Sequence, residues 1–203
     1  KQNTVTLNSL SNMSPTDPHH WFIWRLFRAS SNTQDSGVRF AIGLYEAGDD
    51  SIVESNYVHD HFAGIVLLSG TTGAVDRLRR SIVRANTVEH TVNEALSAYQ
   101  AQDVRVYGNR LRDFNNGIRF GNVFIGPGPV YVYGNTFWNP TIPAAQAESS
   151  GFGFHRPTAA PINVYHNSFS GVRYPFYYGG MASAAGSGTC PTDPGFCLPN
   201  VHI

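Results

Sequence analysis

Val104-Arg-Val-Tyr-Gly-Asn-Arg-Leu111 is the clearest of five copies of one short pattern in this chain. Every copy has a valine three positions before an asparagine and an apolar residue two positions after it. The asparagines are Asn56, Asn86, Asn109, Asn135 and Asn167. Self-similarity on the scale of a few tens of residues is typical of solenoids, in which each repeat forms one coil of a stack.

The alternation within each copy predicts short β-strands. Apolar residues occur at every second position, which buries one face of a strand and leaves the other in solvent. A second apolar stretch follows in each repeat, so every coil should contain at least two strands joined by bends. We expect the inward pairs of this second stretch to be Ile65/Leu67, Leu96/Ala98, Ile118/Phe120, Phe152/Phe154 and Phe176/Tyr178.

The repeated asparagine predicts a polar ladder inside the stack. When coils stack, equivalent strands pair in parallel and each coil covers the apolar face of its neighbour. Asparagine tolerates the left-handed backbone conformation of a tight bend, and its amide can hydrogen-bond both its own turn and the asparagine of the next coil. We therefore predict an internal ladder of asparagine side chains, with the asparagines themselves at the bends.

The Val-x-x-Asn-x-[Val/Leu/Phe] pattern is followed by a glycine-containing turn and a second strand in Asn109-Arg-Leu-Arg-Asp-Phe-Asn-Asn-Gly-Ile-Arg-Phe120. This arrangement resembles the repeat of the pectate-lyase-like superfamily over roughly residues 38 to 178. The resemblance implies an all-β fold, a single-stranded right-handed parallel β-helix (a solenoid) of about six coils with an internal Asn ladder. Members of this superfamily are mostly secreted proteins that act on polysaccharides, chiefly as lyases, hydrolases and epimerases, together with phage tailspikes and some non-catalytic proteins.

The composition is consistent with one turn-rich β domain. The chain has 203 residues, 20 of them glycine, and 13% of its residues are aromatic. Its 14 basic and 14 acidic residues give a net charge of zero, so no basic field argues for a nucleic-acid partner. No run approaches the roughly 18 apolar residues of a membrane-spanning helix. We expect a polysaccharide as substrate or ligand, no nucleic acid and no membrane span.

The two ends of the chain differ from the repeats. We assign residues 1–178 to the β-helix and residues 179–203 to a Gly/Ala/Pro-rich C-terminal tail. The cysteines of this tail, Cys190 and Cys197, predict a local disulfide, which favours an extracellular, secreted protein or a periplasmic one. No amphipathic helical cap is evident before Val5, so an additional chain or segment is expected to cap the N-terminal coil.

Two outward columns of side chains form the predicted substrate-binding surface. Neighbouring coils lie ~4.8 Å apart, so equivalent outward residues make a continuous strip. Tyrosine rings can lie against the apolar faces of sugars while their hydroxyl groups bind the sugar edges. The alternative is that the aromatic side chains stabilise one another. The column two residues before each asparagine is Glu54, Arg84, Tyr107, Tyr133 and Tyr165, and the column four before it is Ile52, Ile82, Arg105, Tyr131 and Asn163. The predicted substrate-binding residues are Glu54, Tyr107, Tyr131, Tyr133 and Tyr165.

The turn after each asparagine carries the densest group of titratable residues. This group comprises His59, Asp60, His61, Glu89, His90, Arg112 and Asp113. A lyase that acts on uronic acids must neutralise a carboxylate and remove the neighbouring proton with a base. The candidates for the first role are Arg84, Arg105 and Arg110, and the candidates for the second are His59, His61 and His90. We expect Arg84, Arg105, His59 and His90 to line one groove.

The predicted function is a secreted lyase that cleaves acidic, uronate-containing glycans by β-elimination, and several alternatives stay open. An inverting glycoside hydrolase would hold two carboxylates, from among Glu54, Asp60, Glu89 and Asp113, about 6.5–9.5 Å apart. Calcium, common in lyases of the superfamily, could be bound by Glu54 with Asp60 or Asp113. His59 and His61 could instead hold a transition metal. A non-catalytic glycan-binding, adhesive or tailspike-like protein would carry aromatic residues and arginines without a converging acid and base.

Overall fold

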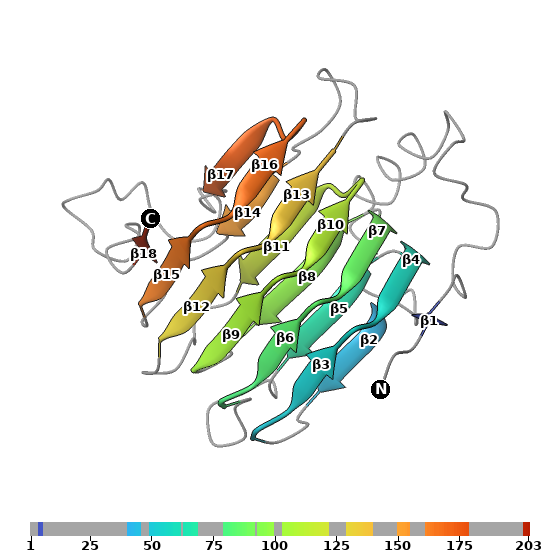
Figure 1. The fold of residues 1–203 in the computed structure, drawn as a ribbon, viewed down its shortest axis with the longest axis vertical. Coiled ribbons are helices and arrows are strands. Elements are labelled where there is room, and N and C mark those ends of the chain that lie inside the picture. Colours follow the sequence, from blue (N-terminus) through green and yellow to red (C-terminus); the bar gives the residue numbers. More distant parts are fainter. Residues whose placement is uncertain are drawn as a thin grey trace, which may run out of the picture.

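The computed structural model describes residues 4–5, 40–45, 49–61, 63–68, 79–91, 93–99, 103–121, 129–139, 150–154, 161–178 and 201–203. These residues form three parallel β-sheets of six strands each. The strands of each sheet lie in chain order along one axis, so the described part of the chain is a parallel β-solenoid (Figure 1). The sequence predicted this all-β architecture from the repeats alone.

Sheet C contains the strand that precedes each asparagine, and sheet A contains the strand that follows it. The strands of sheet C are β3 (Ile52–Glu54), β6 (Ile82–Arg84), β9 (Val104–Tyr107), β12 (Val130–Tyr133), β15 (Ile162–Tyr165) and β18 (Val201–His202). The strands of sheet A are β1 (Thr4–Val5), β4 (Tyr57–His61), β7 (Thr87–Thr91), β10 (Arg110–Arg112), β13 (Thr136–Trp138) and β16 (Ser168–Ser170).

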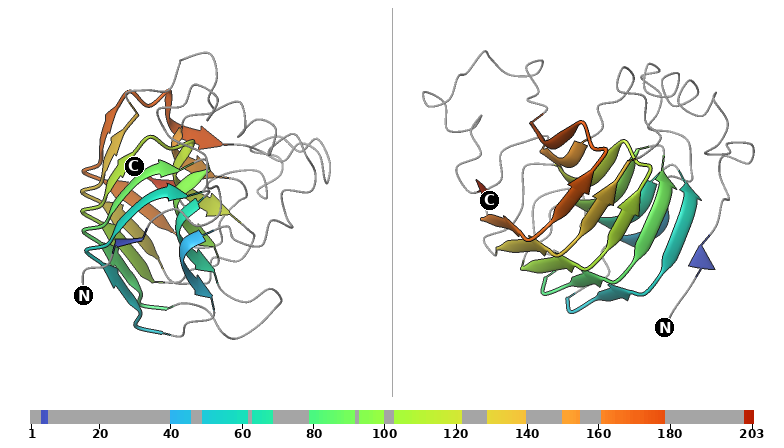
Figure 2. Two further views of the ribbon diagram at one scale, coloured as in Figure 1. Left: turned by 90° about the vertical axis from the view of Figure 1, so that its right-hand side faces the viewer. Right: turned by 45° about the horizontal axis from the view of Figure 1, so that its top comes forward.

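Sheet B contains the second apolar stretch of each repeat. Its strands are β2 (Phe40–Tyr45), β5 (Ala63–Leu68), β8 (Glu94–Tyr99), β11 (Asn116–Gly121), β14 (Ser150–Phe154) and β17 (Tyr174–Tyr178). A complete coil passes through sheet C, sheet A and sheet B in turn, and the stacked coils enclose the interior (Figure 2). Each such coil therefore has three strands, because the bend at the asparagine separates sheet C from sheet A.

Most of the predicted inward residues form the core. The valines three positions before the asparagines are buried, and so are Ile65, Leu67, Leu96 and Ala98 in sheet B. Later coils fill the same interior with aromatic rings, and Phe152 stacks on Phe120 at 6.3 Å and on Phe176 at 5.3 Å between ring centroids. Phe176 keeps 37% of its surface exposed because β17 is the last strand of sheet B.

The predicted asparagine ladder is present. The side-chain Nδ2 of each asparagine donates to the Oδ1 of the next at 2.9 Å, from Asn56 through Asn86, Asn109 and Asn135 to Asn167. The same Oδ1 also accepts the backbone N–H of the preceding asparagine at 3.0 Å. In addition, Nδ2 donates to the carbonyl of the valine one coil back, as from Asn86 to Val53. These bonds satisfy the polar groups that the bend would otherwise leave buried.

One detail of the predicted bend is wrong. The left-handed residue is the one before each asparagine, not the asparagine itself. These residues are Ser55, Ala85, Gly108, Gly134 and His166, with φ between 53° and 63°. The asparagine is needed for its amide, which reaches the neighbouring coils, whereas the change of chain direction occurs one residue earlier.

Several sequence-based predictions fall on residues outside the described ranges. They include the disulfide between Cys190 and Cys197. Within the predicted tail, Val201–His202 forms β18, which pairs with β15 and so adds a strand to sheet C. In the described part of the chain, no helix has the length and apolar character to span a membrane.

Candidate functional site

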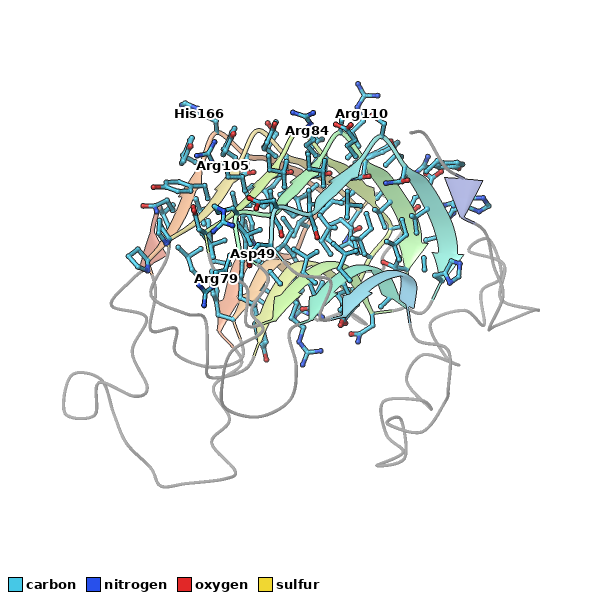
Figure 3. The ribbon with its side chains drawn as sticks, turned by 90° about the horizontal axis from the view of Figure 1, so that it is seen from below. Asp49, Arg79, Arg84, Arg105, Arg110 and His166 are labelled. Carbon is cyan, nitrogen blue, oxygen red and sulfur yellow. The ribbon has the colours of Figure 1, made fainter. Side chains whose placement is uncertain are left out.

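The two predicted outward columns lie side by side on sheet C. Parallel pairing aligns Glu54 with Arg84, Arg84 with Tyr107, and Tyr107 through Tyr133 to Tyr165. The second column runs in the same register from Ile52 to Asn163. Figure 3 shows Arg84 and Arg105 of these columns pointing away from the packed interior. The sequence therefore predicted the order of both columns correctly.

Arg84 is engaged by its neighbours in the column. Its Nε donates to Glu54 Oε2 at 2.7 Å, and its Nη1 donates to the Tyr107 hydroxyl at 3.0 Å. The hydrogen bonds to Tyr107 and Glu54 raise the pKa of Arg84 above its ordinary value. A guanidinium that is already paired with a carboxylate is poorly suited to neutralise a second one on a substrate.

The tyrosines of the column stack on one another. The ring centroids of Tyr107 and Tyr133 are 4.9 Å apart with planes at 3°, and those of Tyr133 and Tyr165 are 5.1 Å apart with planes at 2°. The ring faces that meet in this stack are therefore covered, and the row presents edges and hydroxyl groups to solvent. The tyrosines therefore stabilise one another, which was the alternative to sugar binding in the sequence analysis. The inner ring faces are not available to stack against sugars.

Partial burial raises the pKa of Tyr133. The neighbouring hydroxyl groups of Tyr107 and Tyr165 add to the effect through repulsion between phenolates, and the positive charge of Arg105 opposes it. Tyr131 lies in the other column, aligned with Arg105 on one side and Asn163 on the other.

A second polar surface lies on the outer side of sheet A. Parallel pairing aligns His59, Glu89, Arg112 and Trp138 in one column. The Tyr57 hydroxyl donates to Glu89 Oε1, and the Tyr57 ring lies 4.8 Å from that of His59. Arg112 lies over the Trp138 ring at 4.4 Å and approaches Glu89 Oε2 at 3.9 Å. Carboxylate, guanidinium, phenol and imidazole groups thus meet within neighbouring coils.

An imidazole–carboxylate pair lies at the corner where sheet A ends. His90 Nε2 is 3.3 Å from Asp113 Oδ2, and the same oxygen is 3.2 Å from Arg112 Nε. His90 and Asp113 have left-handed φ values of 56° and 49°. The Asp113 side chain is 7% exposed and that of His90 is 22% exposed, so the carboxylate is inside and the imidazole reaches solvent. An oriented imidazole of this kind is suited to accept a proton.

The remaining candidates differ in their access to solvent. His61 is buried with 2% of its surface exposed, which places it on the inner side of β4. Arg110 is exposed on β10 and points outward (Figure 3). Within the described interactions, Arg105 and Arg110 form no ion pair, in contrast to Arg84 and Arg112.

The predicted grouping of Arg84, Arg105, His59 and His90 is divided between two sheets. The two arginines lie on β6 and β9 of sheet C, and the two histidines lie on β4 and β7 of sheet A. What the structure brings together is a different set on sheet A and its corner: Tyr57, Glu89, His90, Arg112, Asp113 and Trp138. We call this set the sheet A cluster.

Two members of the sheet A cluster were missed by sequence reasoning. Trp138 follows its asparagine by three positions, as do His59, Glu89 and Arg112, so reading that offset through every repeat would have found it. Tyr57 directly follows its asparagine and points outward by the same alternation. The sequence could have identified both residues, because the outward columns on sheet A follow the repeat alignment as closely as those on sheet C.

The described residues hold no group of three or more His, Cys, Asp or Glu side chains arranged to bind a metal ion. Comparison with known proteins finds no matching family model, no matching curated protein and no matching solved structure.

Proposed function

We propose that this chain is a secreted polysaccharide lyase that cleaves acidic glycans by β-elimination. We further propose that its solenoid is the right-handed parallel β-helix of the pectate-lyase-like superfamily, with about six coils. The observation that carries the proposal is the pairing of a solvent-reaching imidazole, His90, with a buried carboxylate, Asp113, beside Arg112. This geometry favours His90 as the base among the three histidines that the sequence left open.

His90 is the proposed base. A carboxylate that accepts from one ring nitrogen fixes the orientation of the imidazole and stabilises its protonated form. Asp113 is in position to do this through Nε2 at 3.3 Å. His61 is buried within the coil and cannot reach a polymer on the outside.

Arg110 is the proposed group that neutralises the substrate carboxylate. It is exposed on β10, one coil after β7, which carries His90. Unlike Arg84, it has no carboxylate partner among the described residues, so its charge is available to a ligand. Arginine binds carboxylates through two parallel hydrogen bonds, which also fixes their orientation.

The proposed elimination needs no external reagent. His90 removes the proton from the carbon next to the uronate carboxylate, and Arg110 stabilises the negative charge that develops on that carboxylate. The electron pair forms a carbon–carbon double bond as the glycosidic oxygen leaves. The Tyr57 hydroxyl, which is held by Glu89, is suited to protonate the leaving oxygen. The products are an unsaturated uronate at one new end and a hydroxyl at the other.

The same cluster is a poor match for an inverting hydrolase. That reaction needs a glycosidic bond between two carboxyl groups. The Arg112 side chain lies between Glu89 and Asp113 and contacts both of them, so it fills the space a sugar would need.

A non-catalytic glycan-binding protein is the second candidate. The stacked tyrosines favour it, because they make sheet C a rigid row of hydroxyl groups that needs no chemistry to bind a polymer. Its expected behaviour differs from that of a lyase, since a binder retains polysaccharide without shortening it.

The deciding experiment is an ultraviolet absorbance assay for unsaturated uronate. The protein is mixed with pectate, alginate, hyaluronan, chondroitin and heparan, each with and without calcium. A rise in absorbance that is lost in His90→Ala supports the lyase and names its substrate class. Polymer retention without any rise, or a rise that His90→Ala leaves unchanged, contradicts the proposed mechanism.

A further inference from the structure

A small pocket lies where two neighbouring coils enter sheet C. It has a volume of about 240 Å³ and is lined by Arg80, Ile82, Asp103 and Arg105. Parallel pairing aligns Ile82 with Arg105, so Arg80 and Asp103 occupy equivalent positions two residues earlier. Arg80 and Asp103 both have a left-handed φ of 52°. The pocket is separate from the sheet A cluster, since none of its lining residues belongs to that cluster.

One wall of the pocket is fixed by ion pairs. Arg80 donates from Nε to Asp50 Oδ1 at 2.8 Å and from Nη2 to Asp50 Oδ2 at 2.8 Å. Its Nη2 also lies 3.1 Å from Asp49 Oδ2. The bidentate geometry orients the guanidinium, the Asp50 carboxylate compensates its charge, and Asp49 adds a second carboxylate on the side of Arg80. Arg80 therefore shapes the pocket without adding an uncompensated charge to it.

The next coil brings two charges to the pocket that are not paired with each other. Asp103 and Arg105 line the same pocket, yet neither forms an ion pair within the described part of the chain. A plain anion would be attracted by Arg105 and repelled by Asp103, and a plain cation would meet the reverse. A ligand without net charge that offers both donors and acceptors gains from both residues.

We propose that this pocket binds one uncharged sugar ring of a glycan. Vicinal hydroxyl groups can donate to the Asp103 carboxylate and accept from the Arg105 guanidinium, while Ile82 contacts the apolar face of the ring. Few polar groups around an apolar contact are typical of small-ligand pockets. The volume suits a single ring better than a longer segment of polymer.

This inference deepens the proposed function and depends on it for the nature of the whole ligand. Arg105 on β9 and Arg110 on β10 belong to one coil. If an uncharged sugar binds at Arg105 and a uronate binds at Arg110, the ligand is a mixed glycan, in which uronates alternate with uncharged residues. The preferred substrate of the absorbance assay is then hyaluronan or chondroitin rather than pectate or alginate.

The direct test compares three sugars of one ring configuration that carry no charge, a negative charge and a positive charge. Binding of methyl glucoside, glucuronic acid and glucosamine, and of their galactose counterparts, is followed by changes in the protein's NMR spectrum. We expect the uncharged sugar of at least one series to bind most tightly. Stronger binding of the uronic acid or the amino sugar in both series, or no binding of any of the six, overturns the inference.

Two charge-removing variants sharpen the test. Asp103→Asn keeps a residue that tolerates the left-handed backbone, removes the repulsion of anions and should shift the preference toward the uronic acid by about fivefold to tenfold. Arg105→Gln should shift it toward the amino sugar by a similar factor. Ser168→Ala, on the exposed face of β16, is the matched control and should change nothing. Unshifted preferences in both variants contradict the assignment.

The outcome for the pocket is separate from the outcome for the lyase. If the uncharged sugar binds but no unsaturated uronate forms, the pocket is confirmed and the catalytic proposal is wrong. If unsaturated uronate forms but the uncharged sugar does not bind, the catalytic proposal is supported and the assignment of the pocket is wrong.

Discussion

Asn109 Nδ2 donates to Asn135 Oδ1 at 2.9 Å, so the two asparagines join neighbouring coils through a hydrogen bond inside the solenoid. Asn109 also accepts two bonds from Asn86 and donates one to the carbonyl of Val83. A single side chain thus serves three coils. Because these polar groups are buried, the loss of one rung removes hydrogen bonds that solvent cannot replace.

Asn109→Ala should lower the free energy of unfolding by about 3 kcal/mol or more. The buried amide and backbone N–H of Asn86 lose their acceptor, and the Val83 carbonyl loses a donor. Denaturant unfolding measures the change. Asn163→Ala, at a half-buried outward position of β15, is the control and should stay within about 0.5 kcal/mol. Equal effects of the two substitutions would show that the ladder contributes little.

Ala85→Gly should stabilise the protein by about 1 kcal/mol. Ala85 has a φ of 54°, a conformation that costs less for glycine, and two equivalent bends already use Gly108 and Gly134. The reciprocal substitution Gly134→Ala should destabilise by a similar amount through backbone strain alone, since an added Cβ would meet no atom closer than 3.9 Å. Thermal unfolding of both variants measures the effect, and the same sign in both would contradict this account.

Stability should depend on the ionisation of Tyr133 at alkaline pH. Its folded-state pKa lies above the ordinary value of 10.0, chiefly through burial. The contribution of protonated Tyr133 to the free energy of unfolding is therefore complete below about pH 10 and is lost as the pH rises through the folded-state pKa. Tyr133→Phe keeps the stacked ring but cannot ionise. Melting temperatures from about pH 9 to about pH 12 should fall less steeply in this variant than in the wild type, and parallel curves would contradict the assignment.

His90→Ala and Asp113→Asn should both reduce formation of unsaturated uronate, by different amounts. Loss of the base removes about 10²-fold to 10⁴-fold of the rate, whereas Asp113→Asn keeps a hydrogen-bonding group and should instead shift the pH–rate profile to lower pH. An asparagine cannot stabilise the imidazolium, so the pKa of His90 in the variant should fall and the rise in rate should occur at lower pH. An unchanged profile in Asp113→Asn would separate Asp113 from the reaction.

His59→Ala is the matched control for the proposed base. His59 lies on the same outer surface, with its ring 4.8 Å from that of Tyr57, and it is aligned with Glu89 of the next coil. It should retain most of the activity. If His59→Ala is inactive and His90→Ala is active, the roles of the two histidines are reversed.

The order of side chains along each outward column could be predicted from the sequence, because parallel stacking keeps equivalent positions in register. Glu54, Arg84 and Tyr107 follow one another on sheet C as the repeat alignment requires. The contacts between columns could not be predicted in the same way. His90 and Asp113 both lie four residues after their asparagines, so their approach follows from the same alignment. The left-handed bend at these positions, where Arg112 of the neighbouring column contacts Asp113, is not revealed by the offsets.

The sequence by itself determined the solenoid, its inward residues and the asparagine ladder, since a repeated pattern of apolar and polar positions has one way to bury its apolar face in every coil. Only the tertiary structure decided which charges are available. It paired Arg84 with Glu54, covered the tyrosine faces by stacking, buried His61 and left Arg105 and Arg110 without an ion pair among the described residues. The physical reason is that side-chain pairing depends on distances and directions across several coils, whereas a repeat specifies only position along the chain.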